Sequence, residues 1–140
     1  MSHEQCNDIG ASGEAAVASE LTAAGFCVYV PVFRSPTTDL VAERNGHLIR
    51  VQVKTLAGDE PVLRFMCRTP ATDTYIGAAE WMALHSTHYG VTAFLKPEEA
   101  GVRPTIRYVM TDHPEKCNTI SEIRYASDYT IDRVIKETET

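Results

Sequence analysis

The dipeptide Asn45-Gly46 is the feature of this chain that most restricts its fold. It separates two runs of strand-forming residues, 39–44 and 47–55. Asn-Gly between such runs is the strongest local signal for a tight β-hairpin, because both positions of the two-residue turn need a positive φ. A two-residue turn also fixes which residues lie opposite one another along the whole hairpin. The sequence therefore predicts a hairpin of defined register.

That register brings polar side chains together on one face of the hairpin. Asp39 lies opposite Gln52, and directly opposed residues have Cβ atoms about 4.5 to 5.5 Å apart. Lys54, two positions beyond Gln52, is a diagonal neighbour within reach of a long side chain. Because side chains alternate along a strand, Arg50 shares this face. The opposite face is apolar and comprises Ile49, Val51 and Val53. We expect one buried face and one that carries polar chemistry.

An amphipathic helix is predicted to begin at Asn7 or Asp8 and to run to about Ala24. Asn7 or Asp8 can cap its first turn, and Gly25 can end it in the left-handed conformation. Its apolar residues are spaced for one buried face and comprise Ile9, Val17, Leu21 and Ala24. Glu14 lies at helical spacing from two of them, which places a carboxylate on this apolar stripe.

The position of Glu14 indicates a cation nearby, because a buried carboxylate without a partner gives up its charge or costs stability. Gly10 and Gly13 remove bulk beside it and would let the helix approach a strand or a ligand closely. If the helix packs over the hairpin, two carboxylates supply hard oxygen ligands for Mg²⁺, with Mn²⁺ as a substitute. The expected ligands are the side chains of Glu14, Asp39 and Gln52 and the backbone carbonyl of Val53.

The order and spacing of these residues resemble the PD-(D/E)XK nuclease superfamily. Its pattern is a glutamate in the first helix, an aspartate that opens the second strand and (E/Q)xK on the third. The segments that carry the resemblance are Gly13-Glu14, Thr38-Asp39-Leu40-Val41 and Val51-Gln52-Val53-Lys54-Thr55, within residues 8–56. Glutamine in place of the usual glutamate is similar to the variant of group I intron homing endonucleases. The segment from Phe33 to Lys54 is also similar to archaeal Holliday-junction resolvases, which normally keep the glutamate.

The resemblance implies a restriction-endonuclease-like α/β fold, with one domain over residues 1–140, and a metal-dependent DNA endonuclease. Its active site would comprise Glu14, Asp39, Gln52 and Lys54. Lys54 would position the attacking water and offset the charge that develops on the phosphate. A homing-endonuclease-like enzyme is the first interpretation, and a nuclease like the junction resolvases is the alternative. A catalytically inactive DNA-binding or assembly module of this fold and an unrelated α/β binding protein stay open.

The remaining apolar runs complete an α/β domain. A chain of 140 residues and 15.5 kDa suits one compact domain. Further strands are predicted at residues 26–30, 62–67, 91–95 and 105–110, and further helices at 75–88 and 129–136. This order favours a mixed central sheet flanked by helices. Tyr75 and Trp81 are expected in the core, with stacking on a nucleic-acid base as the alternative, and His85 and His88 are expected to be exposed or capping residues.

The overall charge is acidic, but one region is basic. The net charge is −6 and the pI is about 5.3, whereas phosphate-binding proteins usually present a basic surface. Residues 34–68 depart from this balance, with six basic and four acidic side chains. We expect DNA phosphates to contact the arginines of this region, namely Arg34, Arg50, Arg64 and Arg68.

The sequence carries no signal for a membrane or for secretion. No stretch approaches the roughly 18 to 20 apolar residues that span a bilayer, and the first residues lack a basic flank followed by an apolar run. We therefore expect a cytoplasmic protein with reduced thiols at Cys6, Cys27, Cys67 and Cys117, which form no CxxC pair. A homodimer or homotetramer is expected, because symmetric cutting of two strands needs two sites and one domain carries one.

Overall fold

The computed structural model describes residues 3–69, 73–108 and 123–140 of the chain. In chain order the elements are α1 (His3–Ala23), β1 (Cys27–Tyr29), β2 (Leu40–Arg44), β3 (His47–Leu56), β4 (Val62–Arg64), β5 (Trp81–Ser86), β6 (Val91–Leu95), α2 (Pro97–Ala100), β7 (Thr105–Arg107), β8 (Ile123–Tyr125), the 3-10 turn η1 (Ala126–Asp128) and α3 (Asp132–Glu137). Within these residues, no helix combines the length and the apolar character needed to cross a lipid bilayer.

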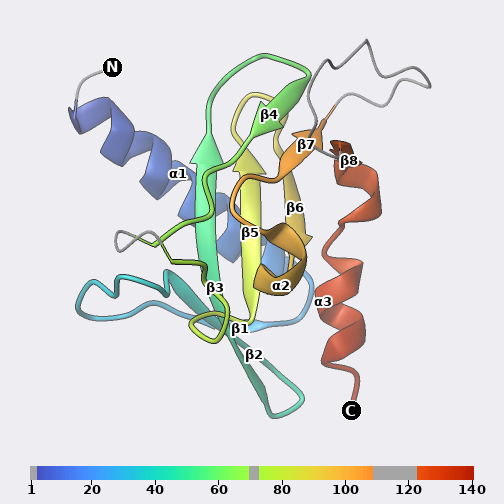
Figure 1. Ribbon diagram of the computed structural model, residues 1–140. Coiled ribbons are helices and arrows are strands. Elements are labelled where there is room, and N and C mark those ends of the chain that lie inside the picture. The colour runs from blue at the N-terminus through green and yellow to red at the C-terminus, as the bar shows by residue number, and fades with distance from the viewer. Residues whose placement is uncertain (1–2, 70–72, 109–122) are drawn as a thin grey trace.

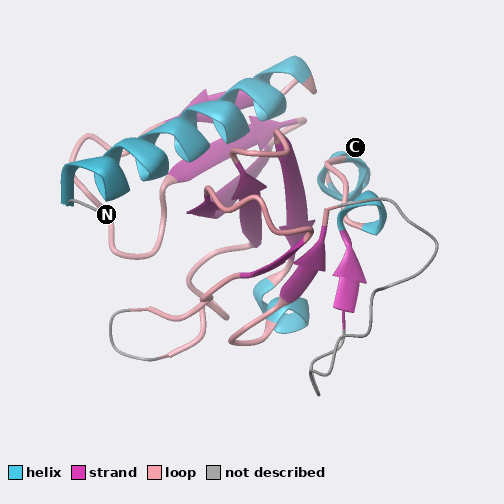
Figure 2. Ribbon diagram, turned by 90° about the horizontal axis from the view of Figure 1, so that it is seen from above, coloured by secondary structure: helices cyan, strands magenta, loops and turns pink. Residues whose placement is uncertain are grey.

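The strands form a five-stranded mixed sheet and a three-stranded sheet (Figure 1). The order of the larger sheet is β1-β2-β3-β5-β6, in which only β3 and β5 run parallel. The smaller sheet has the order β4-β7-β8. Figure 2 shows α1 along one face of the larger sheet and the smaller sheet on the opposite side. The predicted class, an α/β domain with a mixed central sheet flanked by helices, is confirmed.

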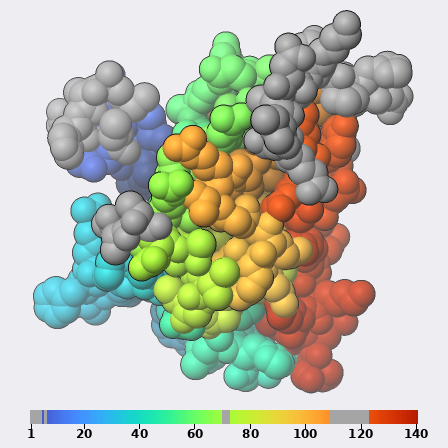
Figure 3. All heavy atoms as spheres, viewed as in Figure 1, coloured from blue at the N-terminus to red at the C-terminus, as the bar shows by residue number. Residues whose placement is uncertain are grey.

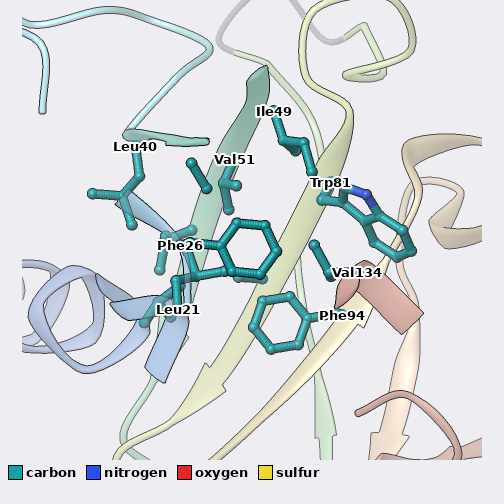
Figure 4. Packing of buried hydrophobic residues seen from close by; sticks show 12 residues of the cluster. Leu21, Phe26, Leu40, Ile49, Val51, Trp81, Phe94 and Val134 are labelled. Atoms are coloured by element: carbon teal, nitrogen blue, oxygen red, sulfur yellow. The ribbon is translucent and has the colours of Figure 1, made fainter. Parts of the chain in front are cut away.

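Two apolar clusters hold these layers together. The first lies between the larger sheet and the helices α1 and α3 and includes Leu21 of α1, Val51 of β3 and Val134 of α3 (Figure 4). The second fills the space between the other face of the larger sheet and the smaller sheet and includes Met82, Leu84, Leu63 and Ile106. Both faces of the larger sheet are buried at β5 and at Gln52 of β3, whereas nearer the turn the hairpin keeps one exposed face, which includes Leu48 and Arg50.

The hairpin forms with the predicted turn and register. Asn45 and Gly46 have φ angles of 52° and 81°, and the strands pair from Arg44 with His47 to Leu40 with Val51. The regular ladder ends there, one pair short of the predicted pair between Asp39 and Gln52. Instead, the backbone N–H of Asp39 donates to the carbonyl of Val51, 3.0 Å away. The regular pairing of β2 with β3 thus ends before Asp39. As a result, the backbone of β3 beyond Val51 is free to bind side chains on this edge.

The prediction of a helix over residues 75–88 is wrong, because this segment contains β5. All six residues of β5 are buried, since the strand lies inside the larger sheet with both faces covered. A strand of this kind reads as a continuous apolar run without alternation, which periodicity alone does not separate from a buried helix. Trp81 and Tyr75 are in the core as predicted, and His88 is exposed. His85 is not exposed or capping but buried, with Nδ1 2.8 Å from the hydroxyl of Thr92.

Other boundaries differ by smaller amounts. The first helix begins at His3, earlier than the predicted caps, and ends before Gly25, whose φ is 97°. The run at 62–67 gives the shorter strand β4, and the terminal helix is α3. The strand predicted at 105–110 is β7 up to Arg107, and the last two positions lie outside the described residues. The elements α2, β8 and η1 were not predicted.

Candidate active site

Two carboxyl groups from different elements meet at the open edge of β3. Glu14 comes from α1 and Asp39 from the residue before β2, and their side chains share a hydrogen bond. Burial raises the pKa of Glu14, and the charge of Asp39 raises it further. Burial also raises the pKa of Asp39, against the opposing effects of the Val53 N–H, Lys54, Glu14 and Arg34. Two acidic side chains whose pKa values are both raised form a site that favours a proton or a cation between them.

The backbone of β3 holds Asp39 in place. The N–H of Val53 donates to Oδ2 of Asp39 over 2.8 Å. This N–H is left without a partner from β2, because the regular pairing ends at Leu40. The carboxylate of Asp39 therefore takes the position that a strand carbonyl would otherwise occupy, which fixes its orientation.

Gln52 lies beside this contact with an unpaired oxygen. Its side chain is only 7% exposed, and Nε2 is 3.5 Å from the carbonyl oxygen of Val53. The other amide atom, Oε1, is buried and has no hydrogen-bond partner among the described residues. An unsatisfied buried acceptor costs about 1–3 kcal/mol, so a water molecule or a cation bound to this oxygen would stabilise the site. Val53 thus contacts Asp39 through its N–H and Gln52 through its carbonyl.

Lys54 reaches the site from the face of the sheet opposite α1. Lys54 pairs with Leu84, which belongs to the cluster under the smaller sheet, whereas Val53 faces α1. The Nζ atom of Lys54 lies 3.0 Å from the hydroxyl of Tyr75, and its charge lowers the pKa of Asp39. Tyr75 was predicted from the sequence as a core residue and not as a partner of Lys54, because the two residues are 21 positions apart.

Cavities lie on both sides of Glu14. One, of about 250 Å³, is lined by Glu14, Arg34 and Asp39 together with Val30, Pro31, Ser35 and Thr38. The other, of about 370 Å³, is lined by Glu14, Val53 and Lys54 together with Ile9, Gly10, Thr55, Leu56 and Ala57. The wall of the first cavity is the connection between β1 and β2, which projects from the surface in Figure 3 (cyan). Solvent and a ligand can therefore reach the carboxyl pair.

The structure places the four predicted DNA-contacting arginines differently. Arg34 lines the carboxylate cavity, and its charge lowers the pKa of Glu14. Arg64 and Arg68 are exposed, on and after β4. Arg50 is exposed but forms an ion pair with Glu80 over 2.7 Å, and it also donates to the carbonyl of Gly77. Among the described residues, Arg34, Arg64 and Arg68 form no ion pair with a carboxylate, whereas Glu80 partly offsets the charge of Arg50.

A glutamate on the first helix, an aspartate before the second strand and Gln52-x-Lys54 on the third define the class of PD-(D/E)XK nucleases. The chain belongs to the PD-(D/E)XK endonuclease family, since a model of that family matches residues 4–79. The resemblance predicted from the sequence is confirmed.

Two solved structures are similar to this chain to different degrees. The bacterial homing endonuclease I-Ssp6803I has a TM-score of 0.71 and 12% sequence identity, over 93% of this chain and 91% of that chain. The Holliday junction resolvase Hjc from the archaeal hyperthermophile Archaeoglobus fulgidus has a TM-score of 0.47 and 21% identity, over 70% of this chain and 83% of that chain. A comparison with curated proteins finds no match.

Proposed function

We propose that this protein is a divalent-metal-dependent DNA endonuclease with Glu14, Asp39, Gln52 and Lys54 as its active site. The observation that carries the proposal is the contact between the carboxyl groups of Glu14 and Asp39 beside the charge of Lys54. Burial raises the pKa of both acids, so the apo site holds more negative charge than its surroundings favour. The family to which the chain belongs supplies the reaction class, hydrolysis of a phosphodiester.

The donor atoms of the site fit a hard divalent cation such as Mg²⁺ or Mn²⁺. Carboxylate and amide oxygens are the ligands these ions prefer, and Mg²⁺ needs few protein ligands because it keeps several waters. The described residues contain no group of three or more histidines, cysteines and acids that could hold a metal, which agrees with a site of only two carboxylates. The groups that would hold the ion are Glu14, Asp39, the orphaned Oε1 of Gln52 and the carbonyl of Val53.

The chain's own groups have separate tasks in the reaction. A bound divalent cation would polarise the scissile phosphate and lower the pKa of a water molecule. Lys54 orients the attacking water and offsets negative charge on the phosphorane. The Val53 N–H fixes the orientation of the Asp39 carboxylate by donating a hydrogen bond to it. Arg34, on the wall of the cavity, attracts the phosphate backbone of DNA.

We further propose a homing-endonuclease-like enzyme that acts as a homodimer or homotetramer. The fold likeness to the bacterial homing endonuclease, over nearly the whole chain, and the glutamine at position 52 both support this type. One domain carries one site, so symmetric cutting of duplex DNA needs at least two copies. Size-exclusion chromatography with light scattering measures the molar mass of the assembly. A monomeric mass both with and without DNA would contradict the proposed oligomer.

The test is incubation of the full chain with supercoiled plasmid, linear duplex and a four-way junction, each with Mg²⁺ and with chelator. Cleavage of plasmid or duplex only with Mg²⁺ supports the proposed endonuclease. Cleavage confined to the junction would replace the homing type with a structure-specific nuclease. Binding without cleavage of any substrate would identify an inactive DNA-binding module.

The affinity for DNA is expected to fall steeply with salt, because Arg34, Arg64 and Arg68 contact phosphates. Each contact contributes about 0.9 decade of affinity per tenfold change in salt. Arg50, whose charge Glu80 partly offsets, contributes less. Replacing Arg34, Arg64 or Arg68 with glutamine should reduce the slope by about one unit each. Lys136→Gln, at an exposed cation on α3, is the control. A flat salt dependence in the parent protein would remove the electrostatic argument.

Gln52→Ala is expected to weaken Mg²⁺ binding and cleavage, because an oxygen ligand is lost. Gln52→Glu keeps the geometry and stays partly active but shifts the metal preference, since three carboxylates replace two. With glutamine, the two carboxylates are neutralised by one Mg²⁺, and a second tightly bound ion is disfavoured. The measurement is the cleavage rate against Mg²⁺ and Mn²⁺ concentration for the three proteins, with calorimetry for metal affinity. If Gln52→Ala matches the parent at every concentration, Gln52 is not a ligand.

A further inference from the structure

We propose that Tyr75 is a positioning residue for Lys54, a role that rests on the proposed function of Lys54 in cleavage. The Lys54 ammonium donates to the Tyr75 hydroxyl over 3.0 Å, and Nζ lies 5.0 Å from the centroid of the tyrosine ring. An ammonium group has three N–H donors, so this bond leaves two for water and phosphate. The flexible lysine chain otherwise samples many rotamers, which a fixed partner restricts.

Tyr75 is itself held firmly. Its side chain is 2% exposed and packs in the apolar cluster under the smaller sheet, with Phe65, Cys67, Met82 and Leu84 among its members. The backbone carbonyl of Tyr75 accepts from the N–H groups of Ala78 and Ala79 over 2.9 and 3.1 Å. The hydroxyl is therefore a fixed point against which a mobile ammonium can be placed.

The segment that carries Tyr75 is also tied to the strand that carries Lys54. Arg50 of β3 donates to the carbonyl of Gly77 over 3.2 Å and pairs with Glu80. The backbones of Arg50 and Glu80 are joined as well, since the N–H of Glu80 donates to the carbonyl of Arg50 over 3.0 Å. The strand β3 thus carries Lys54 and, through Arg50, also holds the segment that contains Tyr75.

The groups near the Lys54 ammonium indicate what its hydrogen bond to Tyr75 is for. Burial raises the pKa of the Asp39 carboxyl and of the Cys67 thiol, and the charge of Lys54 opposes part of this effect on each. Lys54 lines a cavity together with Glu14, and its partner Tyr75 belongs to the apolar cluster, so Lys54 links the carboxyl side of the site to this cluster. The bond to Tyr75 sets how far the ammonium extends toward Asp39 and the phosphate, which decides its use in cleavage.

Tyr75→Phe tests this role, because it keeps the ring and removes only the hydroxyl. We expect kcat to fall by about 10- to 100-fold, as for the loss of a hydrogen bond to a charged group, with KM and DNA affinity unchanged. Tyr108→Phe is the matched control. Tyr108 lies in the same cluster, and its hydroxyl donates to the backbone carbonyl of Leu84 over 2.8 Å and not to Lys54. This variant should lose stability and keep its kcat.

A second measurement reports the position of Lys54 without cleavage. The chain has only four lysines, so the ¹⁵N signal of the Lys54 ammonium can be assigned by its loss in Lys54→Ala. A restrained ammonium gives a sharp signal, which Tyr75→Phe should broaden and Tyr108→Phe should leave unchanged. Equal kcat in Tyr75→Phe and the parent, or equal kcat losses in both tyrosine variants, would overturn the inference. A parent protein that cleaves no DNA would contradict the proposed function instead, and the ammonium signal alone would then decide the contact.

Discussion

Asp39→Asn is expected to abolish cleavage, by about 10²- to 10³-fold or more, while the fold stays intact. Asparagine has nearly the same volume, and its Oδ1 can still accept from the N–H of Val53. The charge is lost, however, and with it half of the negative charge that the site offers to a cation. Lys54→Ala should have an effect of similar size, because it removes the positive charge beside the scissile phosphate. Cleavage rates under single-turnover conditions measure both variants.

The melting temperature of the Asp39→Asn variant provides a second test of the role of Asp39. The folded-state pKa of Asp39 is raised above 3.8, so its contribution to stability is fully present below that value and is lost as pH rises through the raised pKa. At neutral pH the metal-free variant should therefore melt at the same temperature as the parent or higher. Circular dichroism, thermal melting and DNA binding provide the controls. Loss of folding in both Asp39→Asn and Lys54→Ala would assign these residues a structural role.

Gly13→Ala is expected to destabilise the protein by about 1–3 kcal/mol and to reduce cleavage strongly. A Cβ atom at this position would lie 1.8 Å from Oγ1 of Thr55 on β3, so α1 would have to move away from the sheet. Glu14 is the next residue, and the same movement would pull its carboxyl from Asp39. The close approach predicted from the sequence is thus confirmed for Gly13.

Gly10→Ala is the matched control on the same helix. A Cβ at Gly10 would meet nothing within 4 Å, so the variant should gain up to about 1 kcal/mol from helix propensity. Thr55→Ala combined with Gly13→Ala should recover part of the lost stability, because it removes the two closest contacts. Unfolding in denaturant measures all of these variants. A Gly13→Ala protein as stable as Gly10→Ala would show that α1 does not depend on this contact.

Because of three groups in the candidate site, the protein without a metal ion is expected to be less stable than the protein with one. The pKa values of Glu14 and Asp39 are both raised by burial, and Oε1 of Gln52 is buried without a partner among the described residues. One hard cation that binds all three oxygen-bearing groups would offset the unfavourable burial of each. Mg²⁺ should therefore raise the melting temperature of the parent protein, as expected for a ligand that binds only the folded state.

The parts of the fold that sequence predicted correctly depend on local chemistry. The Asn45-Gly46 turn needs only two residues that tolerate positive φ, and it fixed the register up to Leu40. The helix α1 has its own apolar stripe and its own glycine stop. The strand β6 was predicted with its observed bounds, because Lys96-Pro97 ends the apolar run. In each case, residues close in the chain determine the outcome.

Tertiary structure alone decided how the site is assembled. By itself, the sequence determined the hairpin, the first helix and the membership of Glu14, Asp39, Gln52 and Lys54 in one pattern. It did not determine that β2 ends at Leu40, which lets Glu14 and Lys54 approach Asp39 from opposite faces of the sheet. Nor did it show that Gln52 is buried, or that residues 81–86 form a strand. These outcomes follow from burial on both faces of the sheet, which removes the alternation from the sequence and brings together groups far apart in the chain.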